Sequence, residues 1–153
     1  MLEILLGLSA AAAVIGVGGG LYEFSVVDPV WPKRIELVQP AKGGISRKRF
    51  WIASHTVFEL LLIASLIVTW SLPDVRFWLL VALASHATMR IWSAFYFIPK
   101  ALAFEKSGDA PISMTDARQW TRLSRLRLPL DLVTCFAMFS AFAHFVSLET
   151  SLA

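Results

Sequence analysis

The sequence predicts an all-α integral membrane protein, a four-helix bundle with both termini outside and two basic loops in the cytoplasm. Of its 153 residues, 57% are hydrophobic and 16% are charged, against about 25% charged in a typical soluble domain. Four stretches reach the roughly 20 mostly apolar residues that a membrane helix needs. Lysines and arginines gather in two of the three connections between them. The length suits one transmembrane domain, residues 1–153.

The first predicted helix covers about residues 2–27 and ends where Asp28 and Pro29 interrupt the apolar run. Its start lacks the basic region of a cleaved signal peptide, so we expect the helix to be retained. The second predicted helix covers about residues 46–70, with Ser46 as its expected N-cap. Proline and short polar clusters separate these two helices from their neighbours.

The third predicted helix covers about residues 75–104 and contains Pro99, which predicts a kink. The fourth covers about residues 115–148 and is polar as far as Arg127. Trp120 lies among the arginines of this polar part, a pattern typical of a helix at the anionic inner leaflet. A solvated basic helix that only sets the topology fits the same residues equally well.

The basic residues predict the orientation. Twelve of the 14 lysines and arginines flank the first and third connections, while Arg76 lies near the opposite face and Arg90 lies inside a span. The positive-inside rule then places both long loops in the cytoplasm. We expect an integral protein of a bacterial plasma (inner) membrane. The net charge of +3 follows from this topology and indicates no nucleic-acid partner. The twelve are Lys33, Arg34, Lys42, Arg47, Lys48, Arg49, Lys100, Lys106, Arg118, Arg122, Arg125 and Arg127.

Two pairs of ionisable residues lie inside the predicted spans. His55 and Glu59 are four residues apart on the second helix, and His86 and Arg90 are four apart on the third. Each pair therefore shares one helix face. With a rise of about 1.5 Å per residue, Glu59 lies level with His86, and His55 lies level with Arg90. Ionisable groups at such depth are costly and usually face the bundle interior.

Glu23 on the first helix and Asp131 on the fourth lie toward the same cytoplasmic end. We therefore expect a shared polar cavity in which Glu59, Glu23 or Asp131 compensates Arg90. A salt-bridge core that only holds the helices together is the alternative. Two histidines and three carboxylates exceed what one arginine requires, which favours a functional pocket. The residues expected to contact a substrate there are Glu23, Tyr22, Trp92, Tyr96 and Asp131.

Three kinds of chemistry fit the candidate catalytic residues His55, Glu59, His86 and Arg90. The set His55, Glu59 and His86 matches a mononuclear metal site with two histidines and one carboxylate. A haem between His55 and His86 is a second possibility. The third needs no cofactor: a histidine oriented by a carboxylate removes a proton from a lipophilic substrate, and Arg90 stabilises the resulting anion. The cofactor therefore stays open between a metal, a haem and none.

Three stretches resemble the anthrone-oxygenase-like family. They are "GGGLYEFSVVDPVWP" at residues 18–32, "RKRFW" at 47–51 and "RIWSAFYFIP" at 90–99, and the resemblance extends over most of the chain. Members are small four-helix membrane proteins, many of unknown function. The named ones are associated with the oxidation of anthrones to anthraquinones in polyketide pathways. The resemblance thus implies a membrane-embedded oxidoreductase, oxygenase-like, acting on a lipophilic aromatic or polyketide-like molecule.

Two rival functions remain open at this stage. One is a protein for small-molecule binding or proton-coupled transport without redox activity, in which the same acids and histidines relay protons. The other is an assembly partner with a purely structural polar core. Gly16 and Gly20 are spaced to let helix backbones approach closely, which makes a homo-oligomer possible. The partners expected in every case are the lipid bilayer and, for the first two functions, a lipophilic small molecule.

Overall fold

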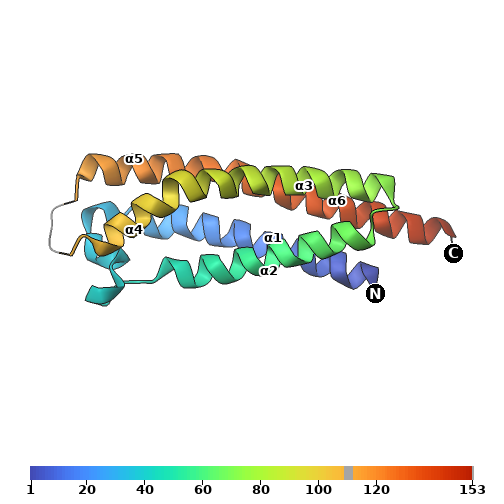
Figure 1. Ribbon diagram of the computed structural model, residues 1–153, viewed down its shortest axis with the longest axis horizontal. Coiled ribbons are helices and arrows are strands. Elements are labelled where there is room, and N and C mark those ends of the chain that lie inside the picture. Colours follow the sequence, from blue (N-terminus) through green and yellow to red (C-terminus); the bar gives the residue numbers. More distant parts are fainter. Residues whose placement is uncertain (109–111, 153) are drawn as a thin grey trace.

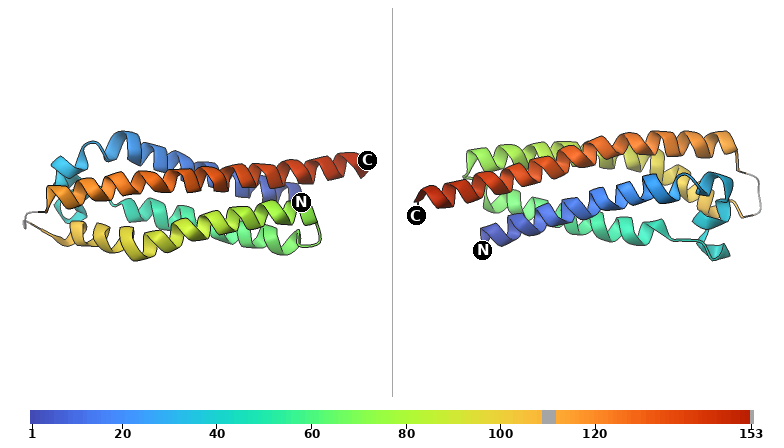
Figure 2. Two further views of the ribbon diagram at one scale, coloured as in Figure 1. Left: turned by 90° about the horizontal axis from the view of Figure 1, so that it is seen from above. Right: turned by 180° about the vertical axis from the view of Figure 1, so that it is seen from behind.

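The computed structural model describes residues 1–108 and 112–152. Within these residues the protein is all-helical and contains no strand. Four helical segments run along a common axis, and both chain ends lie at the end of the bundle opposite the long connections (Figures 1 and 2). This arrangement confirms the predicted all-α bundle. It also places both termini at one end of the bundle and both basic loops at the other end (Figures 1 and 2).

The first segment is α1 (Leu2–Tyr22), which continues without a break into a π-helical turn, η1 (Glu23–Val27). The second segment is α2 (Arg47–Val68). Ser46 occupies the predicted N-cap position of α2, but its side chain makes no capping hydrogen bond. The start of α2 is therefore fixed by packing against α1 rather than by a cap.

The third segment consists of α3 (Pro73–Trp92), a π-helical turn η5 (Ser93–Phe97) and α4 (Ile98–Lys106). Pro99 lies in the first turn of α4, where its missing N–H matters least. The π-helical turn directly before it absorbs the irregularity. Figure 1 shows α4 turning away from the axis of α3, in agreement with the kink expected at Pro99.

The fourth segment consists of α5 (Met114–Ser124), a short 3₁₀ turn η6 (Arg125–Arg127) and α6 (Leu128–Leu152). Trp120 on α5 is only 3% exposed, and the position of this helix at the inner leaflet stays a prediction. The Trp120 ring packs inside the protein because the preceding connections fold back over it and fill the loop end of the bundle.

Three helices are long and apolar enough to cross a membrane. Segment 73–106 is not among them. It bears Asp74 and Arg76 near one end and Arg90 further along. The chain therefore has the character of a membrane protein, and its insertion as four spans stays a proposal. The three helices are Leu2–Val27, Arg47–Val68 and Met114–Ser151.

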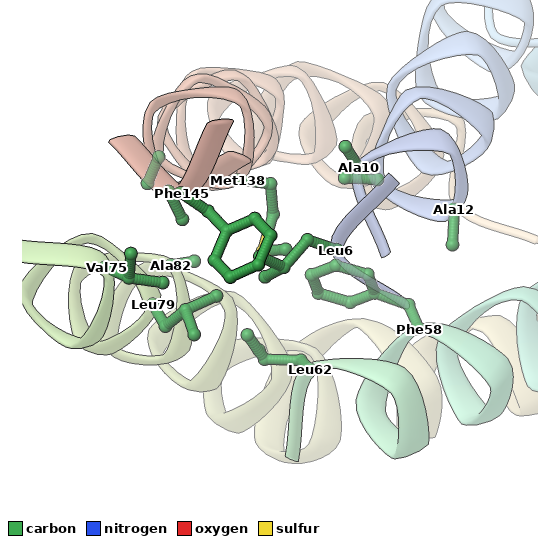
Figure 3. Packing of buried hydrophobic residues seen from close by; sticks show 13 residues of the cluster. Leu6, Ala10, Ala12, Phe58, Leu62, Val75, Leu79, Ala82, Met138 and Phe145 are labelled. Carbon is green, nitrogen blue, oxygen red and sulfur yellow. The ribbon is translucent and has the colours of Figure 1, made fainter. Parts of the chain in front are cut away.

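One apolar core lies toward the chain termini (Figure 3). Leu6, Leu62, Leu79 and Met138 come from the four different segments, and each is at most 1% exposed. Because lipid tails are as apolar as leucine, such a core is stabilised by close packing more than by removal from water.

A second apolar core lies at the loop end. It is built around Trp31, Phe97 and Trp120. The Trp120 ring contacts the other two edge to face, with centroids 5.6 Å from Trp31 and 5.7 Å from Phe97. Trp31 is completely buried, and its indole N–H donates to Asp28 Oδ1 at 3.1 Å. The two cores leave a polar layer between them, and this layer holds the candidate site.

The connection before α2 supplies much of the second core. It folds as three 3₁₀ turns, which bring Trp31 and Val38 inward. Gln39 secures it: the side-chain amide donates to Ser107 Oγ at 2.8 Å and to Gly108 O at 3.2 Å. The sequence suggested only a basic loop here, because isolated tryptophan and valine residues show no helical or strand periodicity. The turns are η2 (Trp31–Lys33), η3 (Ile35–Val38) and η4 (Pro40–Lys42).

We expect Gly44→Ala to destabilise this connection by about 1–3 kcal/mol. A Cβ atom at Gly44 would overlap the backbone oxygen of Glu36 and lie 2.8 Å from the carbonyl carbon of Leu37. Backbone atoms cannot move aside as a flexible side chain can. Gly18→Ala on α1 is the control, because nothing lies within 4 Å of its Cβ position. Thermal unfolding in detergent measures both, and equal midpoints for Gly44→Ala and the native protein would contradict the packing described here.

Candidate functional site

A single carboxylate connects α2 and α3 in the polar layer. Glu59 Oε1 lies 2.8 Å from Arg90 Nε and 3.2 Å from His86 Nε2. The compensation predicted for Arg90 is therefore confirmed, and Glu59 is the partner among the three carboxylates considered. An ionised Glu59 neutralises Arg90 and orients the His86 ring through a charge-assisted hydrogen bond.

His55 does not pair with Glu59, although the two share a face of α2. Its ring stacks on Trp51 at a centroid distance of 5.2 Å and lies 5.5 Å from the ring of His86. We find no hydrogen bond from His55 within the described part of the chain. Glu59 turns toward α3 because the arginine charge lies there, and this leaves His55 as the free imidazole. The histidine–carboxylate pair thus forms between helices through His86, not along α2.

Two small cavities connect these groups to the loop end of the bundle. One, of about 20 Å³, is bordered by His55, His86 and Asp131. The other, of about 30 Å³, is bordered by His55, Asp131, Glu23 and Asp28. Each has room for one or two water molecules. Because His55 and Asp131 border both cavities, the titratable groups form a continuous line from the middle of the bundle to its loop end.

A third cavity is large enough for an organic molecule. It measures about 350 Å³, within the roughly 300–1,000 Å³ typical of ligand pockets. His55 and Arg90 border it on the polar side, and Ile52, Ile98 and Leu102 form part of its apolar wall. It therefore opens between α2 and the α3–α4 segment, where the bend at η5 moves α4 off the α3 axis.

Most of the predicted site residues converge, but the aromatic ones do not. Glu23, His55 and Arg90 border the 350 Å³ cavity, and Asp131 borders the two small ones. Tyr22 is 58% exposed on the outer side of α1.

Trp92 and Tyr96 pack against Phe97, with ring centroids 5.2 Å and 4.9 Å away. Neither borders the 350 Å³ cavity. Both belong to the second apolar core, because the face of α3 and η5 that bears them is covered by the folded connections. Trp51 and Trp120 line the cavity, and contact of Trp92 and Tyr96 with a substrate stays a prediction.

Two arginines of the cavity were not predicted as site residues. Arg47 and Arg127 were assigned to topology, as members of basic clusters. Both line the 350 Å³ cavity. Arg127 donates from Nη1 to Ser93 Oγ at 3.1 Å and from Nη2 to Ser124 Oγ at 2.7 Å. No local pattern distinguishes them from the exposed arginines beside them, so only the fold identifies them.

The metal and haem expectations do not fit the geometry. No three His, Cys, Asp or Glu side chains among the described residues are grouped so that they could hold a metal ion. His86 and Arg90 already occupy one oxygen of Glu59. The cavity that His55 and His86 share is the size of a water molecule, far too small for a haem.

The fold and the site together define an all-helical protein with candidate membrane-spanning helices, an interior line of titratable groups and a lateral cavity. No family model, no curated protein and no solved structure matches the chain. The likeness to the anthrone-oxygenase-like family therefore rests on the three sequence stretches alone.

Asp28 at the loop end makes stability depend on pH. Burial, and secondly the charge of Glu23, raises the pKa of this carboxyl from 3.8 to about 6, although Trp31, Arg47 and Arg125 act in the opposite direction. The folded protein thus binds this proton more tightly than the unfolded chain. The stability from Asp28 is full below pH 3.8 and declines as the pH rises through about 6.

We therefore expect Asp28→Asn to stabilise the protein at pH 7, by up to about 3 kcal/mol. The asparagine oxygen can still accept the indole N–H of Trp31, and no charge is buried. At pH 4 the variant and the native protein should be nearly equal in stability. Thermal unfolding midpoints between pH 4 and pH 7.5 provide the measurement. A constant difference between the two proteins over this range would contradict the assignment.

Proposed function

We propose that the protein is a membrane-embedded oxidoreductase, oxygenase-like, that acts on a lipophilic aromatic or polyketide-like molecule in the cytoplasmic half of the bilayer. One observation supports this most directly. A cavity of about 350 Å³ places the free imidazole of His55 and the guanidinium of Arg90 beside an apolar wall. A base next to a cation suits a weakly acidic substrate that ionises during the reaction.

In this proposal His55 accepts a proton from an activated methylene or hydroxyl group of the substrate. Arg90 stabilises the enolate or phenolate that forms, because a cation in a site of low dielectric interacts strongly with developing negative charge. Glu59 holds Arg90 and His86 in position. The water-sized cavities beside His55 and Asp131 offer the proton a way back toward the loop end.

The proposed oxidation step is the one that the resemblance to the anthrone-oxygenase-like family implies. For an anthrone-like ketone, the anion reacts with dioxygen: the methylene carbon loses two hydrogens and gains one oxygen atom as a carbonyl. The second oxygen atom leaves with both hydrogens as water. The residues of the site supply the deprotonation and the orientation of the substrate, which are the steps that His55 and Arg90 can perform.

Oxidation of anthrone by the purified protein in lipid nanodiscs tests the proposal. Dioxygen uptake and the absorbance of the quinone give the rate, with nanodiscs that contain no protein as the blank. The proposal predicts a rate clearly above the blank, with one dioxygen consumed per quinone formed. A rate equal to the blank for anthrone and for hydroxylated anthrones would count against an oxygenase of this class.

A second candidate function is proton-linked binding or transport of a lipophilic acid. It is favoured by the line of titratable groups, because His86, His55, Asp131 and Glu23 border successive cavities. Such lines form proton relays in membrane transporters. Proteoliposomes with an internal pH-sensitive dye would distinguish the two functions. Proton movement on addition of an unoxidised lipophilic acid, without dioxygen uptake, would favour transport.

A further inference from the structure

Arg47 is the first residue of α2, and it is buried although it belongs to the basic stretch "RKR". Its side chain is 7% exposed. The guanidinium lies over two indole rings, 5.4 Å from the centroid of Trp31 and 4.8 Å from that of Trp120. Both rings are fixed, since Trp31 donates to Asp28 and Trp120 donates to Phe97 O. Cation–π contacts hold the charge in place and leave the N–H donors available.

The terminal nitrogen atoms of Arg47, Nη1 and Nη2, are buried. Among the described residues, neither Nη1 nor Nη2 has a hydrogen-bond partner. The nearest carboxylate oxygen, Glu23 Oε2, lies 3.9 Å from Nη1, beyond hydrogen-bond distance. The other oxygen of Glu23 accepts the indole N–H of Trp51 at 2.9 Å. A buried cation with free donors is costly, so a ligand that satisfies them would bind with a large gain.

Arg127 approaches the same place from the fourth segment. Its guanidinium lies 6.0 Å from the centroid of Trp120, on which Arg47 also lies, and its buried Nε has no partner among the described residues. Glu23, Asp28 and Asp131 border the small cavity beside Arg127, and Asp28 already accepts the indole N–H of Trp31. Both arginines and Glu23 line the 350 Å³ cavity, whose wall toward Ile98 and Leu102 is apolar.

We infer that this cavity takes an amphipathic anion, whose carboxylate, phosphate or sulfate head binds Arg47 and Arg127 and whose apolar body lies along Ile52 and Leu102. A turn of the Arg47 guanidinium about its side-chain bonds places two donors on the head, in the forked geometry that suits such oxyanions. The inference rests on the proposed function and deepens it, because it gives the molecule that reaches His55 a charged group at its other end.

Binding of matched twelve-carbon probes to the native protein tests the inference. Dodecyl phosphate and dodecanoate are compared with dodecanol and dodecyltrimethylammonium, in a neutral maltoside detergent, by titration calorimetry. We expect both anions to bind about tenfold or more tightly than the alcohol, since a charge-assisted hydrogen bond gives about that factor. Equal affinities for anion and alcohol would overturn the inference without any variant.

Arg47→Gln removes the charge and keeps the stem, so the preference for anions should fall by about tenfold or more. Arg49→Gln removes an exposed charge two residues further along and should keep the full preference. An Arg47→Gln protein that still prefers anions as the native protein does would overturn the assignment. If Arg47→Gln does not fold, Arg47→Lys replaces it, because lysine lacks the fork and should bind the anions more weakly.

Native mass spectrometry from nanodiscs of mixed zwitterionic and anionic phospholipid distinguishes the two sources of such an anion. A retained anionic phospholipid, lost in Arg47→Gln, would identify the head as that of a bilayer lipid. Binding of the added dodecyl probes without retained phospholipid would identify a free lipophilic acid. His55→Gln separates this inference from the proposed function: the variant should lose oxidation activity and still bind dodecyl phosphate with native affinity.

Discussion

His55→Gln is expected to lower the rate of substrate deprotonation by about 100- to 10,000-fold, the usual contribution of a general base. Glutamine resembles histidine in polarity and can still stack on Trp51, but it cannot accept a proton at neutral pH. The direct measurement is the loss of deuterium from the labelled methylene of anthrone without oxygen. This readout follows proton removal alone and is independent of the oxidation step.

His144→Gln is the matched control for this experiment. His144 is exposed near the opposite end of the bundle and stacks on Trp78, with ring centroids 6.4 Å apart. It borders none of the three cavities around His55. The variant should exchange deuterium at the native rate. Equal rates for His55→Gln and the native protein would show that His55 is not the base, and would leave His86 as the other imidazole of the candidate site.

Glu59→Leu is expected to destabilise the bundle by about 2 kcal/mol. The change leaves Arg90 without a counter-charge and His86 without its hydrogen-bond partner. The full cost of breaking a buried pair is roughly 3–5 kcal/mol. The value expected here is lower because the side chains of Glu59 and Arg90 are each 37% exposed. Unfolding by titrated sodium dodecyl sulfate in mixed micelles gives the free energy.

The double change Glu59→Leu with Arg90→Leu separates stability from function. Removing both charges avoids the unpaired arginine, so most of the lost stability should return. Substrate deprotonation should remain lost, because Arg90 no longer stabilises the anion. A double variant that is both stable and fully active would show that the ion pair only holds the helices together. That result would support the structural reading of the polar layer.

The sequence predicted the helices well, because their signals are local. Each apolar run of membrane length is continuous in the sequence, and Asp28 and Pro29 mark the end of the first helix directly. The folded connection before α2 was missed for the opposite reason. Trp31 and Val38 are buried by contacts with α4 and α5, distant in sequence, and no periodicity within the connection reveals them.

The sequence predicted which residues gather at the candidate site better than it predicted which of them pair. Depth placed Glu59 level with His86, spacing put His86 and Arg90 on one face of the third helix, and the structure joins all three. Spacing along α2 could not show that Glu59 faces α3 and leaves His55 free. Burial of Arg47 was also beyond prediction, because three adjacent basic residues share one pattern, and only tertiary contacts distinguish the one placed between two tryptophans.

We expect the 350 Å³ cavity to ionise a lipophilic acid, with His55 as the base. The most direct measurement is the absorption spectrum of an alkylated nitrophenol bound to the protein, since its phenolate and phenol forms absorb at different wavelengths. At a pH where the free probe is mostly neutral, the native protein should bind it as phenolate and His55→Gln should bind it as neutral phenol. Bound probe that stays neutral in the native protein, or ionises equally in both proteins, would contradict this expectation.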